Sequence, residues 1–195
     1  MRALKQTEGL FLFPEESPEG WRAGIREASP FTPEAKGESE EQGGKSTETP
    51  LVSVIIPTYN RAYCLGATLE SVLAQTWSRL EVLVVDDGST DETRGLIEGI
   101  ASIDSRVRYI SQENGGVAAA RNTGIRNVRG DYVAMLDSDD LWLPWKLEAQ
   151  VGILERFPEL GLVWTEMEAI DPEGRVTHER YLRRMYSGYE FWKMQ

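Results

Sequence analysis

The chain has 195 residues, of which 41% are hydrophobic and 27% charged, and its formal net charge is −11. This length and composition are those of an ordinary globular protein that can bury a sizeable core. The negative charge argues against a nucleic-acid partner, because it repels phosphate backbones. An anionic ligand would therefore have to be held by a metal ion or by a few placed arginines.

Cysteine and histidine are scarce, with Cys64 and His178 as the single residue of each type. One cysteine cannot form an internal disulfide, and one cysteine with one histidine cannot form a thiolate–imidazole zinc site. A single histidine also nearly excludes nucleophilic catalysis that depends on a histidine base. Carboxylates and metal ions therefore remain as the candidate catalytic groups. We also expect that the protein resides in a reducing compartment. The first residues lack the apolar run of a signal peptide, and no stretch approaches the ~20 apolar residues of a spanning helix. We therefore expect a cytoplasmic protein, with peripheral attachment at the inner membrane face left open.

Residues 1–49 differ in amino-acid composition from the rest of the chain. They are rich in Glu, Ser, Gly and Pro, and their apolar residues come only in patches such as Leu10–Phe13. We expect this segment to be a disordered tail or linker, with the domain occupying residues 50–195. The patch could dock on the domain or on a partner, but a loose tail is the preferred interpretation.

From Leu51 onward, short apolar runs alternate with segments of helical spacing. The expected strands, in chain order, are Val52–Ile56, which Pro57 would end, Glu81–Val85, Val107–Ile110, Asp131–Leu136 and Leu160–Glu168. Four helices are expected, and the first and third span Tyr63–Gln75 and Gly116–Asn127. The second begins at a capping box of Ser89 and Glu92 and runs to about Ile100. The fourth follows Pro144 and has Leu147, Val151 and Leu154 on its inner face. A turn is expected at Asp171–Gly174.

This alternation with short connections predicts an α/β fold with a mostly parallel sheet. The nearly continuous apolar runs fit strands that helices cover on both faces of such a sheet. In these sheets ligands bind beyond the carboxyl ends of the strands. The residues that follow the strands are therefore the candidates for a binding site.

Two of the expected strands end in acidic clusters. Asp86 and Asp87 follow the second strand, and Asp137, Asp139 and Asp140 follow the fourth. Carboxylates gathered at one edge repel one another and need a cation or a donor-rich ligand. Mg²⁺ fits, because it takes one or two carboxylates and completes its shell with water and substrate phosphates. The two clusters together indicate a metal-bridged diphosphate site, whereas either one alone could simply cap a turn.

Two further segments carry candidate ligand-binding residues. The glycines of Asn114–Gly124 could bring a helix N-terminus close to a ligand, and Arg121 within it could reach a phosphate or a carboxylate of the site. The alternative is a helix packed through its alanines, with Arg121 in solvent. At the carboxyl end of the first strand, Pro57–Arg61 places Tyr59 where its ring could stack on a base. Taken alone, this second segment indicates only a turn.

In combination these segments resemble the family 2 glycosyltransferases, which are inverting enzymes with the GT-A fold. The matching segments, in the family's order, are Val52–Asn60, Ser71–Thr76, Glu81–Asp91, Asn114–Gly124, Gly130–Tyr132 and Leu136–Asp140. The resemblance implies a mostly parallel, Rossmann-like sheet flanked by helices. It also implies transfer of a sugar from a nucleoside-diphosphate sugar, with a UDP-sugar as the expected donor, in polysaccharide or cell-wall synthesis.

The resemblance further implies roles for individual residues. The implied substrate-binding residues are Pro57, Tyr59, Asn60, Asp87, Arg121 and Asp137. The first three would line the nucleoside pocket, and Asp87 would accept a hydrogen bond from the base. Arg121 would neighbour the diphosphate or the acidic edge, and Asp137 would sit against the ribose. Asp139, in the DxD motif, would bind the Mn²⁺ or Mg²⁺ that bridges the phosphates and stabilises the departing nucleoside diphosphate.

The chain departs from the family pattern after the metal motif. The family's catalytic base, a carboxylate that deprotonates the acceptor hydroxyl, lies well beyond that motif, and few residues follow Asp140 here. Glu166, Glu168 and Asp171 are the nearest carboxylates, and nothing in the sequence marks any of them as the base. We therefore expect a C-terminally incomplete domain that lacks its general base.

Two other functions compete with an active transferase. A non-catalytic nucleotide-sugar-binding module would retain the donor site without the acceptor half, and this alternative stays open. A nucleotidyltransferase shares the broad fold and the metal chemistry, but it would begin with a phosphate loop rich in glycine and arginine. Ile56–Arg61 contains no such loop, so we set this alternative aside.

Overall fold

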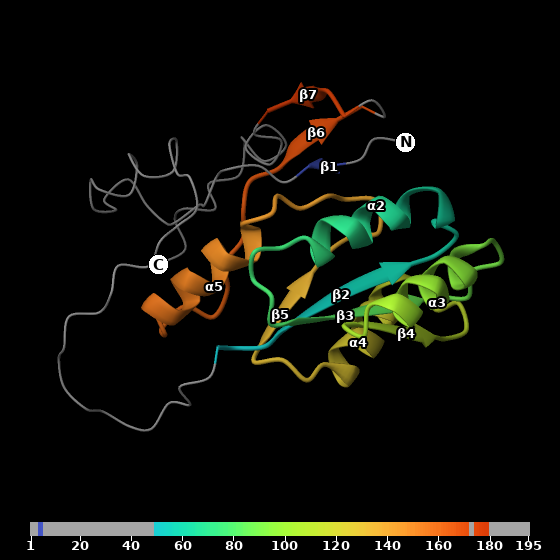
Figure 1. Ribbon diagram of the computed structural model, residues 1–195, viewed down its shortest axis with the longest axis horizontal. Coiled ribbons are helices and arrows are strands. Elements are labelled where there is room, and N and C mark those ends of the chain that lie inside the picture. The colour runs from blue at the N-terminus through green and yellow to red at the C-terminus, as the bar shows by residue number, and fades with distance from the viewer. Residues whose placement is uncertain (1–3, 6–48, 172–173, 180–195) are drawn as a thin grey trace. The chain divides into compact units, whose positions relative to one another are not determined.

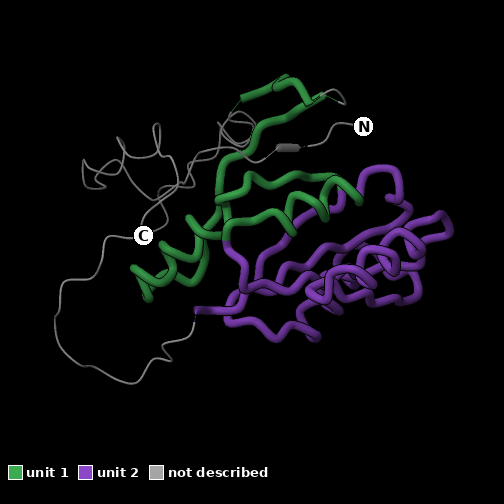
Figure 2. Tube along the Cα trace, viewed as in Figure 1, with its two compact units in different colours: residues 1–30, 66–76, 139–195 green, residues 31–65, 77–138 purple. Residues whose placement is uncertain are grey.

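The computed structural model describes residues 4–5, 49–171 and 174–179. The chain divides into two compact units (Figure 2). Unit 1 comprises Met1–Pro30, Gly66–Thr76 and Asp139–Gln195, and unit 2 comprises Phe31–Leu65 and Trp77–Ser138. Helix α2, Ala62–Leu73, begins in unit 2 and continues into unit 1.

Unit 2 is built on a sheet of four parallel strands in the order β4-β3-β2-β5 (Figure 1). The strands are β2, Val52–Thr58, β3, Leu80–Asp86, β4, Val107–Ser111, and β5, Tyr132–Met135. In register, β2 pairs with β3 from Val52↔Leu80 to Thr58↔Asp86, and with β5 from Val52↔Tyr132 to Ile55↔Met135. The predicted α/β fold with a mostly parallel sheet is confirmed.

The strands differ in burial according to their place in the sheet. Every residue of the two inner strands, β2 and β3, is buried, as expected for apolar runs covered on both faces. The edge strand β5 instead alternates between half-buried and exposed residues. The expectation that Pro57 ends the first strand is wrong, because β2 continues through Pro57 to Thr58. A proline removes one donor from the ladder, and the pairing of β2 with β5 has already ended at Ile55, before Pro57.

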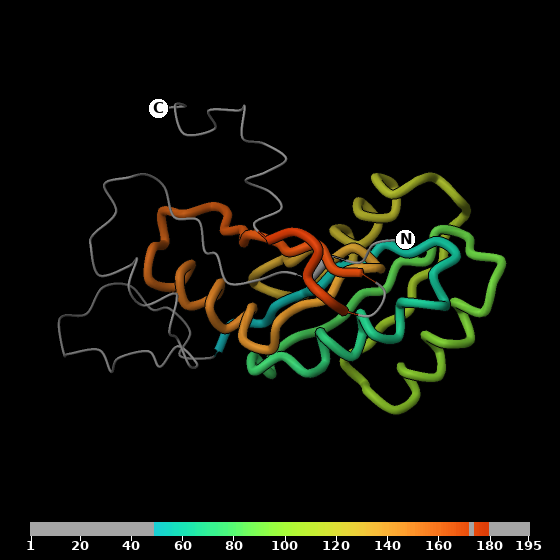
Figure 3. Tube along the Cα trace, turned by 90° about the horizontal axis from the view of Figure 1, so that it is seen from above, coloured from blue at the N-terminus to red at the C-terminus, as the bar shows by residue number. Residues whose placement is uncertain are grey.

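Two helices of unit 2 cover the sheet. Helix α3, Thr93–Ile103, contacts β3 and β4, and helix α4, Val117–Asn127, contacts β2 and β3. Figure 3 shows them on opposite faces of the sheet, as right-handed crossovers require when the chain runs from β2 to β4 in one direction and then returns across the sheet to β5. Ile55, Val85 and Ala120 form a buried cluster between sheet and helix. A Cβ on Gly124 would overlap the side chain of Ile55, so glycine permits this close packing.

The capping box predicted for α3 does not form. The helix begins at Thr93, and Glu92 precedes it without a side-chain capping bond. The Ser89 hydroxyl oxygen instead accepts a hydrogen bond from the backbone N–H of Asn60 at 2.8 Å. The Asp91 carboxylate caps the start of the helix, because it accepts a hydrogen bond from the N–H of Thr93 at 3.0 Å. A tertiary contact has therefore displaced the local capping interaction.

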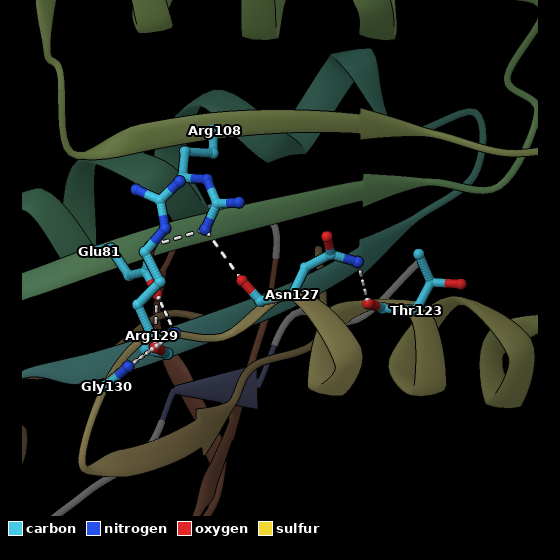
Figure 4. A network of polar contacts seen from close by, with 7 residues as sticks. Glu81, Arg108, Thr123, Asn127, Arg129 and Gly130 are labelled. Atoms are coloured by element: carbon cyan, nitrogen blue, oxygen red, sulfur yellow. Dashed lines mark hydrogen bonds and ion pairs between the residues drawn. The ribbon is translucent and has the colours of Figure 1, made fainter.

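A polar network holds the amino ends of the strands, at the edge opposite the acidic clusters (Figure 4). The buried Glu81 carboxylate accepts from the Ser53 hydroxyl at 2.7 Å, the Arg108 guanidinium at 2.8 Å and the Arg129 N–H at 2.8 Å. Arg108 also donates to the carbonyl of Asn127, the last residue of α4, at 3.0 Å. Burial raises the pKa of Glu81, but these donors together outweigh it and leave the pKa below its usual value.

Unit 1 contains helix α5, Lys146–Arg156, and an antiparallel sheet in the order β1-β6-β7. Its strands are β1, Leu4–Lys5, β6, Glu168–Ile170, and β7, Val176–His178. The inner face predicted for α5 is right at Leu147 and Val151, but Ile153 is buried where Leu154 was expected, and Leu154 is only half-buried.

The strand predicted over Leu160–Glu168 is wrong, since β6 begins at Glu168. The segment before it includes the exposed side chains of Leu162 and Trp164, so its apolar residues do not mark a buried strand. The predicted turn is present, because the Gly174 N–H donates to the Asp171 carbonyl at 2.9 Å, and Gly174 has a φ of 80°. The expectations for residues 6–48, including Leu10–Phe13, lie outside the described residues. Among the helices that the structure describes, none is long and apolar enough to cross a membrane.

Candidate nucleotide-sugar site

The candidate site lies at the carboxyl edge of the sheet in unit 2. Because the four strands are parallel, the residues that follow β2, β3 and β5 all emerge at this edge. Asp87 follows β3 and Asp137 follows β5, with β2 between them. Two strand spacings separate the positions, which is about 10 Å at ~4.8 Å per spacing. The sheet therefore brings the two residues to one edge, two strand positions apart.

Asp87 is buried, with 3% of its surface exposed, and its carboxylate holds the segment that leads into α4. Oδ1 accepts from the Gln112 side-chain amide at 2.7 Å and from the Gly115 N–H at 2.9 Å, while Oδ2 accepts from the Gly116 N–H at 2.7 Å. Gly116 has a φ of 85°, which glycine adopts without strain. Burial raises the pKa of Asp87, but the hydrogen bonds from Gly115, Gln112 and Gly116 outweigh it and lower the pKa below its usual value.

This arrangement bears on the predicted role of Asp87 in base recognition. A carboxylate offers about four acceptor positions, and three donors of the protein already use it. By this count one acceptor position is left for a further donor, such as an N–H of a base. The glycines before α4 were expected to face a ligand, but Gly115 and Gly116 direct their N–H groups at this carboxylate instead.

The neighbouring Asp86 is the buried last residue of β3 and has a structural partner on each side. Its carboxylate accepts from the Tyr109 hydroxyl at 2.8 Å and from the Ser89 N–H at 2.9 Å. Sequence reasoning missed Tyr109 and Gln112 as partners of this acidic pair. The available signal was that Tyr109 lies in the third expected strand and Gln112 follows it, and a parallel sheet can place that strand beside the second.

The three predicted nucleoside-pocket residues have different environments. Pro57 lies inside β2, paired in register with Val85, and is buried in the sheet. Tyr59 follows the strand, and 46% of its surface is exposed. Asn60 is half-buried, and its side-chain oxygen accepts from the Thr90 N–H at 2.8 Å. Tyr59 is therefore the member of this group whose ring is open to a ligand.

Arg121 projects from α4 to the residue that follows β5. Its guanidinium donates to the Asp137 carboxylate at 2.6 Å, with 40% and 53% of the two side chains exposed. Arg121 Nε is buried and, within the described part of the chain, has no hydrogen-bond partner. The same holds for the hydroxyl of Thr58, the last residue of β2. This edge therefore combines an accessible ion pair with polar atoms that the protein's described groups do not satisfy.

Asp139 is half-buried and opens the last segment of unit 1, two residues along the chain from Asp137. Within unit 1, the end of α2 holds the loop that follows Asp139. The Ser71 hydroxyl accepts from the Trp142 N–H at 3.2 Å, and the Gln75 side-chain oxygen accepts from the Leu147 N–H at 3.0 Å. Gln75 thereby satisfies one of the unpaired N–H groups in the first turn of α5.

The carboxylates at this motif can meet only part of what a divalent ion requires. No group of three or more His, Cys, Asp or Glu side chains that could hold an ion occurs among the described residues. A protein cage for the metal is therefore not present there. A site of one or two carboxylates does fit Mg²⁺ or Mn²⁺, because these hard ions complete their shells with water and phosphate oxygens.

The three carboxylates considered for the catalytic base are found in unit 1. Glu166 is buried, and its Oε1 accepts from the Met167 N–H at 3.2 Å. Glu168 is the half-buried first residue of β6. Asp171 accepts from the Arg175 N–H at 2.9 Å and from its guanidinium at 2.8 Å across the β6–β7 turn. These contacts give Asp171 a role in the hairpin and give none of the three a catalytic assignment.

A parallel sheet with this strand order, and with polar and acidic residues beyond its carboxyl ends, defines the class of nucleotide-binding α/β domains. Comparison with known proteins specifies the class further. The model of the family "Glycosyl transferase family 2" matches residues 53–194. The chain therefore belongs to glycosyltransferase family 2.

Individual relatives agree with this assignment. A UDP-Glc:alpha-D-GlcNAc-diphosphoundecaprenol beta-1,3-glucosyltransferase of Escherichia coli is 42% identical over 105 residues, which cover 53% of this chain and 41% of that protein. The structure of S. aureus TarS 1–349 in complex with UDP-GlcNAc matches with a TM-score of 0.52 and 30% identity, over 55% of this chain and 32% of that one. The mannosyltransferase PcManGT of Pyrobaculum calidifontis, in complex with GDP-Man and Mn²⁺, matches with a TM-score of 0.52 and 34% identity, over 55% and 33%. The chain spans 20% of the length of one curated relative, an uncharacterized glycosyltransferase of Rickettsia bellii, and 41% of the E. coli glucosyltransferase.

Proposed function

We propose that this chain binds a nucleoside-diphosphate sugar, with a UDP-sugar as the expected donor, and supports inverting transfer of the sugar to an acceptor, which is a carbohydrate, a lipid or a protein. The observation that carries the proposal is the placement of Asp87 and Asp137 beyond the two strands that flank β2. The strand order reverses between β2 and β5, and open α/β sheets bind nucleotides at such a reversal. Family membership and the sugar nucleotides held by the related structures support the same donor class.

The base would bind at the β2–β3 side of this edge. The half-exposed ring of Tyr59 offers a stacking surface of the kind that holds nucleobases. The remaining acceptor position of Asp87 suits the N–H of a uracil, and the lowered pKa keeps this carboxylate ionised at neutral pH. Pro57, buried near the end of β2, and Asn60, which directly follows Tyr59, would line the nucleoside pocket on either side of this ring.

The ribose and the diphosphate would bind toward the β5 side. Asp137 can accept from ribose hydroxyls through the half of its side chain that is exposed. Arg121 already donates to Asp137 and supplies the positive charge that a diphosphate needs in a chain of net charge −11. The ion pair would thus orient both groups before the ligand arrives.

Asp139, with Mn²⁺ or Mg²⁺, would hold the diphosphate end. Its carboxylate is the ligand type that these ions prefer, and its half-buried position leaves part of it open to a ligand. When bound, the ion neutralises charge that develops on the departing nucleoside diphosphate. The protein's part is to hold the chain that follows Asp139, through the bonds of Ser71 to Trp142 and of Gln75 to Leu147 in α5.

Titration calorimetry of the chain with UDP in the presence of Mn²⁺ tests the proposal. We expect saturable binding, and we expect Asp139→Ala to weaken it by roughly 10–100-fold, as for the loss of groups that support a metal site. Asp131→Asn is the matched control, because Asp131 precedes β5 at the opposite edge, where its carboxylate accepts from the Leu51 N–H at 2.8 Å. An asparagine oxygen preserves that bond, so binding should be unchanged. Absence of UDP binding, or full binding by Asp139→Ala, would contradict the proposal.

A further inference from the structure

Asn60 stands out in the backbone of the carboxyl edge. It is the one non-glycine residue with a positive φ, 52°, among those that the structure describes. Asparagine enters this left-handed region more easily than other residues with a side chain, although glycine enters it at no cost. A glycine would therefore satisfy the backbone at this position, so the backbone alone does not account for the asparagine side chain.

The side-chain oxygen of Asn60 joins two loops of the site. Oδ1 accepts from the Thr90 N–H at 2.8 Å, from the Asp91 N–H at 3.3 Å and from the Thr90 hydroxyl at 3.5 Å. The backbone N–H of Asn60 donates in turn to the Ser89 hydroxyl at 2.8 Å. The turn that follows β2 is thereby fastened to residues 89–91, which lie just beyond Asp87.

The same two loops are fastened again just beyond Asn60. The Arg61 N–H donates to the Thr93 hydroxyl at 3.1 Å, and the Ala62 N–H donates to the Asp91 carboxylate at 3.2 Å. These N–H groups lie at the start of α2, where the helix itself offers them no acceptor. The loop after β3 therefore caps α2, and Asn60 lies at the first of the connecting bonds.

The connected loops carry the two groups proposed to contact the base. Tyr59 directly precedes Asn60, and Asp87 is separated from Ser89 by Gly88 alone. On its other side, Ser89 is held through its N–H by the Asp86 carboxylate at 2.9 Å. Residues 88–91 are thus fixed between Asp86 and Asn60. The Asp87 N–H also donates to the Thr58 carbonyl at 2.9 Å, so Tyr59 lies between this last bond of the sheet and the Asn60 connection.

We infer that Asn60 is a positioning residue, whose side-chain oxygen holds the turn that carries the stacking ring of Tyr59 against the loop that follows Asp87. The inference rests on the proposed function, since it assigns the two fixed groups to base recognition. It differs from the expectation that Asn60 itself lines the nucleoside pocket, because the oxygen that could serve as a ligand is used between the loops.

Two substitutions separate positioning from direct contact. Asn60→Gly keeps the left-handed backbone accessible and removes the oxygen acceptor. Asn60→Asp keeps an acceptor oxygen and tolerance of the left-handed region, and it removes the amide donor that a direct contact to a base could use. A positioning role predicts that Asn60→Gly weakens UDP binding by about tenfold, from the loss of several net hydrogen bonds. It predicts that Asn60→Asp binds within about threefold of the wild type, because the aspartate restores the acceptor.

Amide hydrogen exchange of the nucleotide-free chain supplies a second readout. Faster exchange at Thr90 and Asp91 is expected in Asn60→Gly, with wild-type protection in Asn60→Asp and a cooperative thermal transition in both. Weak UDP binding by Asn60→Asp with protected loop amides would overturn the inference in favour of a direct contact. Wild-type binding by Asn60→Gly would also overturn it. If the wild-type chain binds no UDP, the proposed function fails, whereas the exchange data still show whether Asn60 fastens the loops.

Discussion

Two buried carboxylates, at the two ends of one strand, are each held by several hydrogen-bond donors of the protein. Glu81 lies at the start of β3 and Asp87 directly after its end, and each accepts at least three hydrogen bonds from the protein. In both, donors outweigh the effect of burial and lower the pKa. A buried carboxylate with several donors stays ionised and stabilises the fold only while it is ionised.

The position of Glu81 predicts how acid affects stability. Because its pKa in the folded state lies below the ordinary value of 4.5, its contribution is fully present above pH 4.5 and is lost as the pH falls through the lower folded-state pKa. Glu81→Gln should reduce the free energy of unfolding at pH 7 by about 1–3 kcal/mol, through loss of charge-assisted hydrogen bonds. The difference from the wild type should shrink toward pH 3.

Urea unfolding at a series of pH values measures this difference. Glu159→Gln, at an exposed position in the chain, is the control and should follow the wild-type curve throughout. A constant difference between Glu81→Gln and the wild type from pH 7 to pH 3 would show that the Glu81 charge is not the source of the effect.

At the scale of elements, α4 packs closely on β2. This packing depends on Gly124, where a Cβ would overlap Ile55. It determines the position of α4, the helix that carries Arg121. The Asp87 carboxylate holds the start of the same helix, and the Arg108 bond to Asn127 holds its end. The helix is therefore fixed at both ends and along its length before any ligand binds.

Gly124→Ala should destabilise the chain by about 1–3 kcal/mol, because the added methyl group has no space against Ile55. Gly99→Ala, in the exposed surface of α3, is the matched control, since a Cβ there meets nothing within 4 Å. This control should gain about 0.5–1 kcal/mol, as alanine is the better helix former. Thermal unfolding of the two variants gives the comparison, and equal stability would show that α4 does not pack this closely.

At the scale of the whole molecule, the sequence predicts the sheet of unit 2 and the edge where its chemistry lies. The two inner strands can be predicted from the apolar runs Val52–Ile56 and Glu81–Val85. Short apolar runs between helical segments are typical of buried parallel strands. The prediction fails where a tertiary contact replaces a local one. The Ser89 hydroxyl accepts from the Asn60 N–H instead of capping the helix, and the side chains of Leu162 and Trp164 before Glu168 are exposed. The use of Asp87 by three donors of a later segment is likewise invisible in local sequence, since it depends on the register of β3 with β4.

We propose that the carboxyl edge of the sheet in unit 2 binds a nucleoside diphosphate through Asp87 and Asp137, and that Asp139, two residues further along the chain, binds the divalent ion. NMR spectra of the isotope-labelled chain with UDP and substoichiometric Mn²⁺ test it most directly, since the paramagnetic ion broadens the signals of nearby amides. We predict that the amides of Ser138, Asp139 and Asp140 broaden first and only when UDP is present, while Mg²⁺ with UDP shifts those of Asp87 and Gly88 without broadening. Broadening spread over the acidic surface, or independent of UDP, would contradict the claim.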